Sequence, residues 1–501
     1  MHKGLKKHIL FQCAAIILPA VLFSGCAHFL PSGRLSKEKF QNNTVRITST
    51  VQTPYFYSPW LWKRPQQISG QGIIISENTV LTLASIVRNA KLIELKIGSE
   101  PIPTPMKVKA IDIDANLAIL EGNLPEQAEP VSISDDTDFT RAAQVNLYWK
   151  TSNGIIREGN AVLDRMEIEY NTDSYQAHIM PRAVKSTQPG VGYGAPVFDA
   201  SGNFYGLARR AGDKYTFNII TCDIINRSFD LKNGVRRQPT AVPGFITAPL
   251  LQVYYRKKLG LTEDNGGCLV SKVFGQGSGS QKLKEGDVLL SVCGRKLDAW
   301  GRYLHPEYGK ISYLHLFSEY FLKDDFPVRV VRNRKVISFS LDLSNINSNK
   351  WLTPSNPFSK PTDYIVRGGF VFVPLTQTYL EEWGADFINK APTELVSVFN
   401  NNRYKVKSDT KKEFVLLSRV LSHPSNIGFQ DLNNMIIEKI NGRSVKSLKQ
   451  FAEILNSPSG NLVKLQLAPG HIPLWLSKES LKSADDEISA RYGIDKLESI
   501  R

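Results

Sequence analysis

Cysteine is scarce in this chain of 501 residues, which contains only five. Two of them, Cys13 and Cys26, lie near the N-terminus, and the others are Cys222, Cys268 and Cys293. Their spacing matches no zinc-binding pattern, and three cysteines cannot all pair with one another. We therefore predict no metal and no other cofactor, and we expect the last three to be small buried residues in strands.

Long apolar runs are also scarce, and the one candidate lies at the start of the chain. Residues 1–25 contain three lysines, then the run ILFQCAAIILPAVLF, then Ser24 and Gly25. A basic start, a short apolar stretch and small residues before a cleavage point are typical of a secretory signal peptide. An uncleaved anchor helix is the alternative, but the run is short for a membrane span.

Cys26 follows these small residues in the arrangement of a bacterial lipobox, with Phe23 where leucine is more usual. We predict that Cys26 carries a lipid, that residues 26–43 form a polar tether, and that the protein lies in the bacterial cell envelope. Ala27, in place of an aspartate after the cysteine, favours the outer membrane, with the protein facing the periplasm.

Acidic residues are fewer than basic ones, and the net charge is +15. The first 25 residues hold three lysines and no acid, so the remaining chain keeps about +12. Nucleic acid is a poor candidate partner outside the cytoplasm, whereas acidic lipid headgroups or acidic polymers fit the charge. The chain is too long for one hydrophobic core, so we expect about two to four domains.

Turn-rich stretches divide the chain into three parts. Short β-branched or apolar runs separated by turn residues fill the barrel part, residues 44–235, and predict an all-β barrel or sandwich. The middle part, residues 240–345, follows a polar, proline-bearing boundary. An Asn/Ser/Pro-rich linker at 346–363 precedes the C-terminal part, residues 364–501, which closes with a charged helical tail.

Three segments of the barrel part resemble those that carry the catalytic triad in the HtrA/Deg family of trypsin-like proteases. LTLASIV resembles the histidine strand, with Ser85 in the place of histidine. DANLAIL resembles the aspartate segment, with Asn116 in that place, and QPGVGYGAP resembles the serine loop, with Tyr193 as the replacement. The resemblance implies a mainly β fold, a trypsin-like double β-barrel followed by two α+β PDZ-like domains.

The three replacements remove the groups that the protease mechanism needs. The hydroxyl of Ser85 is no base near neutral pH. Asn116 is neutral and cannot stabilise an imidazolium, and Tyr193 places a bulky ring where a small nucleophile should lie. The loop before it is also altered at Val191 and Gly192, because a β-branched residue resists the backbone turn that forms an oxyanion hole. We predict a pseudoprotease.

A rewired triad is the alternative. Asp114 lies two residues before Asn116 on what we expect to be the same strand, and we expect His178 to lie in a strand before the serine loop. These two residues are the candidates for an acid and a base if the chain is an active endopeptidase.

The middle part contains VPGFITAP, GGCLVSKVF and KEGDVLLSVCG, which resemble a PDZ domain. Such domains accept a peptide as an added strand and bind its terminal carboxylate through loop amides. The candidate carboxylate loop consists of Pro243, Gly244, Phe245 and Ile246. The candidate residues of the following strand are Gly267, Cys268, Leu269 and Val270.

The C-terminal part contains VLSHPSNIGFQDLNNMIIEKING, which resembles the C-terminal PDZ region of plant-type Deg proteases. The resemblance implies self-assembly, and we expect a trimer-based homo-oligomer. An aromatic segment near the start of the barrel part could supply trimer contacts or simply pack in a core or lid; it holds Tyr55, Phe56, Tyr57, Trp60 and Trp62.

These features together predict an inactive envelope lipoprotein that binds unfolded or C-terminal peptide segments of envelope proteins through its PDZ grooves. It would act as a chaperone-like holder, an adaptor or a scaffold, attached to the membrane through its lipid. One alternative is an active serine-type endopeptidase of envelope protein quality control. A third hypothesis is a structural envelope protein whose basic surface binds acidic polymers.

Overall fold

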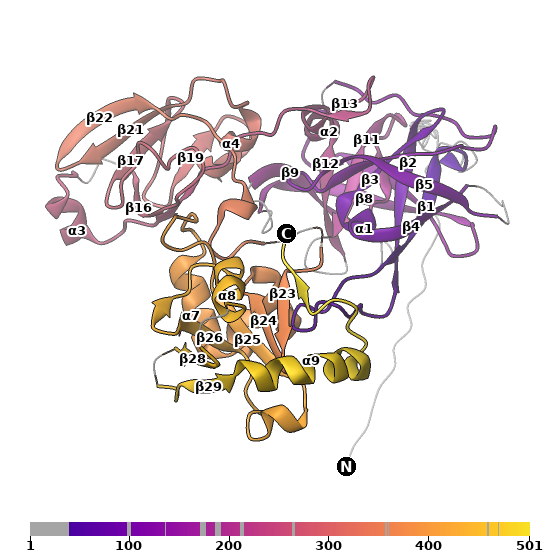
Figure 1. Cartoon of the computed structure of the whole chain (residues 1–501). Coiled ribbons are helices and arrows are strands. Elements are labelled where there is room, and N and C mark those ends of the chain that lie inside the picture. The colour runs from indigo at the N-terminus through magenta and orange to yellow at the C-terminus, as the bar shows by residue number, and fades with distance from the viewer. Residues whose placement is uncertain are drawn as a thin grey trace, which may run out of the picture. The chain divides into compact units, whose positions relative to one another are not determined.

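The computed structural model describes residues 40–97, 102–135, 137–170, 177–185, 192–210, 215–262, 266–355, 358, 360–457, 460–468 and 470–501 (Figure 1). The predicted signal peptide and the lipid site Cys26 lie outside these residues. Within them, no helix combines the length and the apolar character that crossing a membrane would require.

The first half of the barrel part forms a closed six-stranded barrel in the order β1-β2-β3-β6-β5-β4. Its strands are β1 (Thr44–Val51), β2 (Gln66–Ser76), β3 (Thr79–Leu83), β4 (Ala90–Lys96), β5 (Thr104–Asp112) and β6 (Leu117–Glu121). All five residues of β3 are buried, as a strand in a barrel wall packed on both faces requires. The short helix α1 (Ala84–Val87) follows β3 directly, so the sequence run LTLASIV is half strand and half helix.

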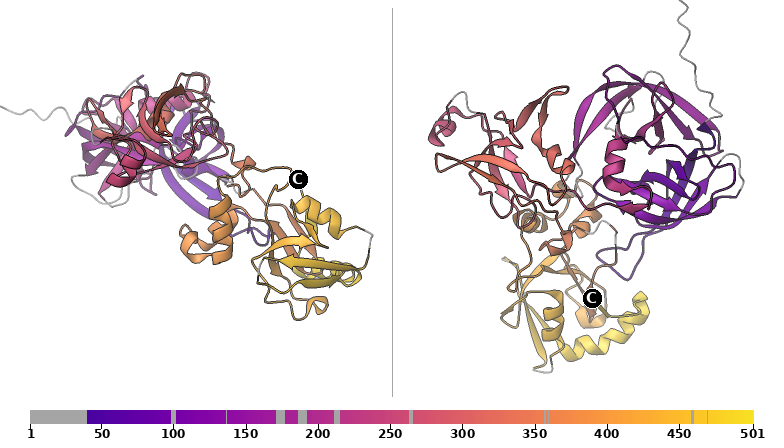
Figure 2. Two further views of the ribbon diagram at one scale, coloured as in Figure 1. Left: turned by 90° about the vertical axis from the view of Figure 1, so that its left-hand side faces the viewer. Right: turned by 90° about the horizontal axis from the view of Figure 1, so that it is seen from above.

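The second half forms another closed barrel, in the order β10-β11-β12-β9-β8-β7 (Figure 2). Its strands are β7 (Gln144–Lys150), β8 (Ile156–Tyr170), β9 (Ala177–Lys185), β10 (Pro196–Phe198), β11 (Phe204–Arg210) and β12 (Thr216–Thr221). Helix α2 (Cys222–Ser228) and the short pair β13 (Phe229–Asp230) and β14 (Val235–Arg236) follow. The two barrels confirm the predicted trypsin-like fold.

The middle part is built around an antiparallel sheet in the order β15-β16-β17-β21-β22, with β18 beside β17. Its strands are β15 (Phe245–Ala248), β16 (Cys268–Val273), β17 (Val288–Val292), β18 (Arg295–Lys296), β21 (Pro327–Arg332) and β22 (Lys335–Ser340). The other elements are α3 (Val253–Lys258), the hairpin β19 (Arg302–His305) and β20 (Gly309–Ser312), η2 (Tyr313–His315) and α4 (Leu316–Glu319). Its core includes Phe245, Phe317 and Phe326.

The C-terminal part has an eight-stranded sheet in the order β29-β28-β26-β25-β24-β23-β30, with β27 beside β26. Its strands are β23 (Tyr364–Arg367), β24 (Phe370–Pro374), β25 (Val415–Val420), β26 (Met435–Ile440), β27 (Arg443–Ser444), β28 (Leu462–Leu467), β29 (Leu474–Ser477) and β30 (Glu498–Ser499). Its helices are α5 (Gln377–Leu380), η4 (Glu381–Trp383), α6 (Phe387–Lys390), α7 (Thr393–Asn402), η5 (Pro424–Asn426), α8 (Leu448–Leu455) and α9 (Lys478–Tyr492).

Two apolar clusters flank this sheet, so both of its faces are covered. One cluster contains Phe451 of α8, and the other contains Leu395 of α7 and Ile488 of α9. The charged tail of the sequence is α9, which Figure 1 shows in yellow beside β29. Within the segment predicted as a linker, η3 (Ser348–Lys350) is followed by Trp351, which is buried and pairs with Val406.

The three later cysteines are free. The expectation that they would be buried in strands holds for Cys268, which lies in β16. Cys222 is buried but begins helix α2 instead. Cys293 is half-buried in a turn, with a positive φ of 47°.

The aromatic segment near the N-terminus packs partly into a core. Phe56 is only 5% exposed and belongs to the apolar cluster that contains Tyr379. Its amide donates to Glu382 Oε1 at 3.3 Å, and Arg419 Nη1 donates to Ser58 Oγ at 3.0 Å. Phe56 therefore packs in the core, as one of the two alternatives predicted, and its ring is not available to contact a second copy of the chain. The predicted trimer stays a prediction.

Candidate functional site

Ser85, Asn116 and Tyr193 come from two different barrels. Ser85 lies in the first turn of α1, where the chain leaves β3. Asn116 is the last residue of the tight turn between β5 and β6, and its φ of 57° is one that asparagine tolerates well. Tyr193 lies in the loop before β10 of the second barrel. Each of the three residues is half-buried.

Hydrogen bonds connect the three residues in a continuous chain. The amide of Ser85 donates to Asn116 Oδ1 at 2.9 Å, and the amide of Ala84 donates to Asn116 O at 3.0 Å. The hydroxyl of Ser85 donates to Tyr193 Oη at 3.0 Å. The structure thus brings together all three positions that the sequence singled out.

This chain of groups has no member that can take a proton near neutral pH. Acyl transfer by a hydroxyl needs a general base within hydrogen-bond reach, and the pKa of that base must lie near the working pH. Here the partner of the Ser85 hydroxyl is a phenol, and the partner of its amide is a neutral carboxamide. The arrangement can hold the two barrels together, but it supplies no general base.

The loop around Tyr193 lies directly against β2. The amide of Gln71 donates to Tyr193 O at 2.8 Å. A Cβ on Gly194, whose φ is 80°, would lie 2.7 Å from Gln71 O, so this position requires glycine. A Cβ on Gly192 would lie 2.8 Å from Gln71 Cγ. Val191 lies outside the described residues, so its predicted effect on the oxyanion hole stays a prediction.

Gln71 also joins the barrels through its side chain, which is a role that the sequence did not reveal. Its Nε2 donates to Lys150 O at 3.0 Å, and its Oε1 accepts from the Lys150 amide at 2.9 Å. Burial lowers the pKa of Lys150 to about 8. Lys150 Nζ donates to Gln41 O at 2.7 Å, so this amine is directed to the N-terminal segment.

The residues considered for a rewired triad have other partners. Asp114 lies in the β5–β6 turn rather than on a strand, and its carboxylate binds Arg236 at 2.6 Å. Arg236 also binds Asp112 at 2.9 Å. His178 lies in β9 and interacts with the backbone of Asp114; among the described residues, no hydrogen bond joins it to Ser85 or Tyr193.

His178 should make the folded state sensitive to acid. Burial, and then the charge of Arg227, lower its pKa to about 4. The unfolded chain binds this proton near pH 6.5, so unfolding becomes more favourable as the pH falls from about 6.5 towards 4. We expect this residue to remove about 3 kcal/mol of the free energy of unfolding between pH 7 and pH 4. Denaturant titrations at several pH values measure it. His178→Phe should flatten the dependence of the free energy of unfolding on pH. An unchanged dependence in that variant would show that His178 is not the group responsible.

The candidate carboxylate loop of the middle part is mostly buried. Pro243 and Gly244 are buried, and a Cβ on Gly244 would lie 2.4 Å from Gln276 O. Phe245 points into the core, whereas Ile246 is 40% exposed. Because β15 is the last strand at its end of the sheet, its outer edge is the place where a peptide strand would add.

The other four candidate residues lie in or directly before β16. Gly267 precedes β16, and Cys268, Leu269 and Val270 belong to it. Strand β16 pairs with β15 on one side, while Cys268 and Leu269 pair with β17 on the other. Both edges are therefore occupied at Leu269, so this segment lies inside the sheet, and the prediction that part of it lines a peptide groove stays a prediction.

A helical wall beside β15, formed by η2 and α4, was not predicted from the sequence. Tyr313 stacks on Phe245 with 6.4 Å between ring centroids, and Phe317 contacts it edge-on at 5.9 Å. Tyr313 Oη lies 3.2 Å from Thr247 Oγ1 of β15. The spacing of four residues between Tyr313 and Phe317, with Leu316 between them, was a helical signal in the sequence.

Comparison with known proteins places this geometry in context. Residues 353–501 match the protein family described as PDZ domain. Protease Do-like 2, chloroplastic, from Arabidopsis thaliana is 22% identical over 92% of this chain and 75% of its own length. Putative protease Do-like 12, mitochondrial, from the same plant is 23% identical over 87% of this chain and 82% of its own length. The chain is an HtrA/Deg-family protease homologue.

A solved structure, the HtrA-type protease AlgW with a decapeptide, covers 61% of this HtrA/Deg homologue and 96% of its own chain. The sequence identity is 16% and the TM-score is 0.45. The matched relatives extend over most of the HtrA/Deg homologue, from the barrels to the C-terminal part.

Proposed function

We propose that this HtrA/Deg homologue is catalytically inactive and binds unfolded or C-terminal peptide segments. The hydrogen bond between the hydroxyls of Ser85 and Tyr193 carries the proposal, because it occupies the place where the family's mechanism needs a histidine and a serine. An active endopeptidase with a rewired site would need His178 near a nucleophile, and the contacts of His178 do not support that.

Peptide binding through the middle part is supported by the outer edge of β15, with which no described strand pairs, and by the loop that precedes it. A strand added to this edge would gain main-chain hydrogen bonds, and the exposed Ile246 would contact its side chains. The decapeptide in the structure of the HtrA-type protease AlgW is a ligand of the same chemical class.

The setting that we propose is the bacterial envelope. The protein would be anchored by a lipid on Cys26, facing the periplasm from the outer membrane, and would assemble as a trimer-based homo-oligomer. In that setting an inactive peptide binder would serve as a chaperone-like holder, an adaptor or a scaffold. The net charge of about +12 after the signal peptide suits an acidic lipid surface nearby.

Ile246→Asp should weaken peptide binding by about tenfold or more, because an adjoining strand would bury the new carboxylate without a partner. Fluorescence anisotropy with a labelled decapeptide that ends in an apolar residue measures the Kd. Leu462→Asp is the matched control, since Leu462 is 60% exposed on β28. If Ile246→Asp, Leu462→Asp and the unaltered chain had the same Kd, the peptide would bind at a site that does not include Ile246.

A further inference from the structure

Helix α3 (Val253–Lys258) is unusual because it buries none of its six residues, all of which lie within the described range. A helix on a globular protein normally buries one face. Here Tyr254 is 85% exposed and Val253 is 51% exposed. Leu251, just before the helix, is 52% exposed. These side chains form an apolar surface that contacts water instead of a core.

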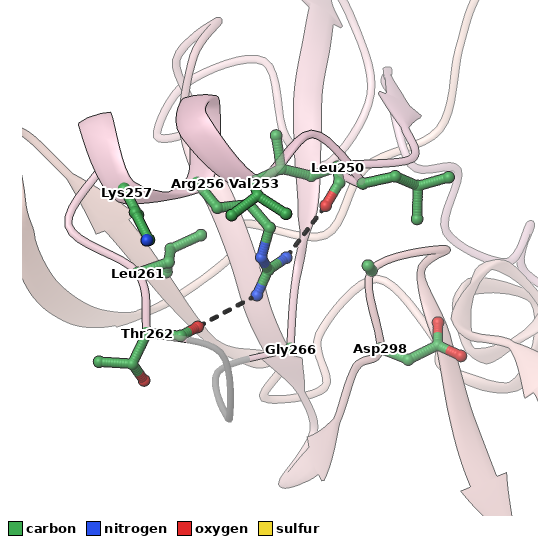
Figure 3. A pocket seen from close by; sticks show the side chains of 10 residues that line it. Leu250, Val253, Arg256, Lys257, Leu261, Thr262, Gly266 and Asp298 are labelled. Carbon is green, nitrogen blue, oxygen red and sulfur yellow. Dashed lines mark hydrogen bonds between the residues drawn. The ribbon is translucent and has the colours of Figure 1, made fainter.

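A hollow of about 440 Å³ lies beneath this helix (Figure 3). Leu250 and Leu261 line it and are almost completely buried. The amide of Leu250 donates to Ala299 O at 2.9 Å, which holds the loop that carries Trp300 at the rim. Trp300, the residue after Ala299, is 56% exposed and adds an aromatic side chain to this loop.

Basic residues surround the same surface. The last turn of α3 contains Arg256, Lys257 and Lys258. Arg334 joins them, because its Nε donates to Lys258 O at 3.1 Å. The carboxylate of Asp298, which also lines the hollow, is engaged by Arg302. Figure 3 shows Arg256 beneath the helix, bonded to the backbone oxygens of Leu250 and Thr262.

We propose that this α3 face docks on an anionic lipid surface; the face consists of Leu251, Val253, Tyr254, Lys257, Lys258 and Trp300. Aromatic and aliphatic side chains enter the headgroup region, while neighbouring lysines bind anionic headgroups. An acidic surface complements the basic rim, and a membrane can receive the exposed ring of Tyr254, which stands out from the fold.

The chain length between the proposed anchor and the folded part favours a membrane as the occupant. Residues 26–39 span at most about 50 Å even when fully extended. A lipid on Cys26 would therefore keep the start of the described part, Phe40, within about 50 Å of the bilayer and the folded chain at a high effective concentration near it. This argument from effective concentration rests on the proposed lipid anchor at Cys26. The apolar and basic character of the α3 face does not depend on that anchor.

Vesicle co-sedimentation tests the proposal with the mature-length chain in which Cys26→Ser prevents lipidation. The chain should bind vesicles of phosphatidylglycerol mixed with phosphatidylcholine, should ignore pure phosphatidylcholine, and should dissociate as salt increases. Lys257→Glu with Lys258→Glu should lower the partition coefficient by about tenfold or more, since each lysine near such a surface contributes about fivefold. Val253→Ser with Tyr254→Ser should lower it as well.

The control is an equal charge change elsewhere, Lys446→Glu with Lys449→Glu, both exposed in or near α8. It should leave most of the binding intact. Equal losses in both charge variants, or no binding to anionic vesicles, would overturn the proposal. The proposal would also be overturned if the α3 variants bound vesicles normally but no longer bound a glutamate-rich decapeptide. The α3 face would then be a peptide-binding site. Binding of the apolar decapeptide, which depends on Ile246, should be unchanged and separates this test from that of the proposed function.

Discussion

Replacing Asp287 with alanine should destabilise the middle part by about 2–3 kcal/mol, because the charge-assisted hydrogen bonds of a buried carboxylate to Arg332 and to the Lys284 amide are lost. The side chain of Asp287 is 1% exposed. Both of its oxygens accept from the Arg332 guanidinium at 2.7 Å, and Oδ2 also accepts from the Lys284 amide at 2.9 Å. The aspartate precedes β17 and the arginine ends β21, so the pair ties two neighbouring strands together.

Chemical denaturation of the whole chain, followed by the signal of the middle part, measures this effect. Asp342→Ala is the matched control, because Asp342 is 65% exposed and pairs with Lys282 at 2.8 Å. A surface pair of this kind contributes about 0–1 kcal/mol. If the free energy of unfolding fell equally in the two variants, the Asp287–Arg332 pair would contribute no more than an exposed pair.

On the proposed inactivity, grafting a His-Asp-Ser triad onto the three positions should create protease activity. We expect the triple variant Ser85→His, Asn116→Asp, Tyr193→Ser to hydrolyse an unfolded protein about 10³-fold faster than the unaltered chain. A complete triad contributes on the order of 10⁶ in kcat, and a damaged oxyanion loop removes about 10²–10³ of it. The Ser85 amide lies 2.9 Å from Asn116 Oδ1 and the Ser85 hydroxyl lies 3.0 Å from Tyr193 Oη, so the three positions are neighbours.

The double variant Ser85→His, Tyr193→Ser is the control, since it keeps the neutral Asn116. An asparagine in the aspartate's place leaves the imidazole in the wrong tautomer and lowers kcat about 10⁴-fold. Turnover in the triple variant but not in the double variant would establish the roles of the three positions. If neither variant hydrolysed the substrate while circular dichroism showed an intact fold, positions 85, 116 and 193 would lack the geometry of a triad.

The barrels could be predicted from the sequence because short strands separated by turn residues are local signals. The three triad positions could be predicted because each lies within a short run, such as LTLASIV, that resembles a segment of the HtrA/Deg family. The structure then shows Ser85, Asn116 and Tyr193 joined by hydrogen bonds, although the last two are far apart in the sequence.

The rest could not be predicted because it depends on pairing between distant segments. Whether β16 has a free edge depends on β17, which lies beyond a long loop. The bonds that occupy Asp114 come from Arg236 in another element. The burial of Phe56 requires a cluster built from the C-terminal part. A single run of sequence contains none of this information.

Hydrolysis of an unfolded protein such as casein by the purified chain is the most direct test of catalytic inactivity. We predict background turnover that is identical for the unaltered chain, for Ser85→Ala and for Tyr193→Phe, because among the described residues the two hydroxyls bond to each other and to no base. Turnover above background that disappears in either variant would contradict the account, since one of these hydroxyls would then be a nucleophile.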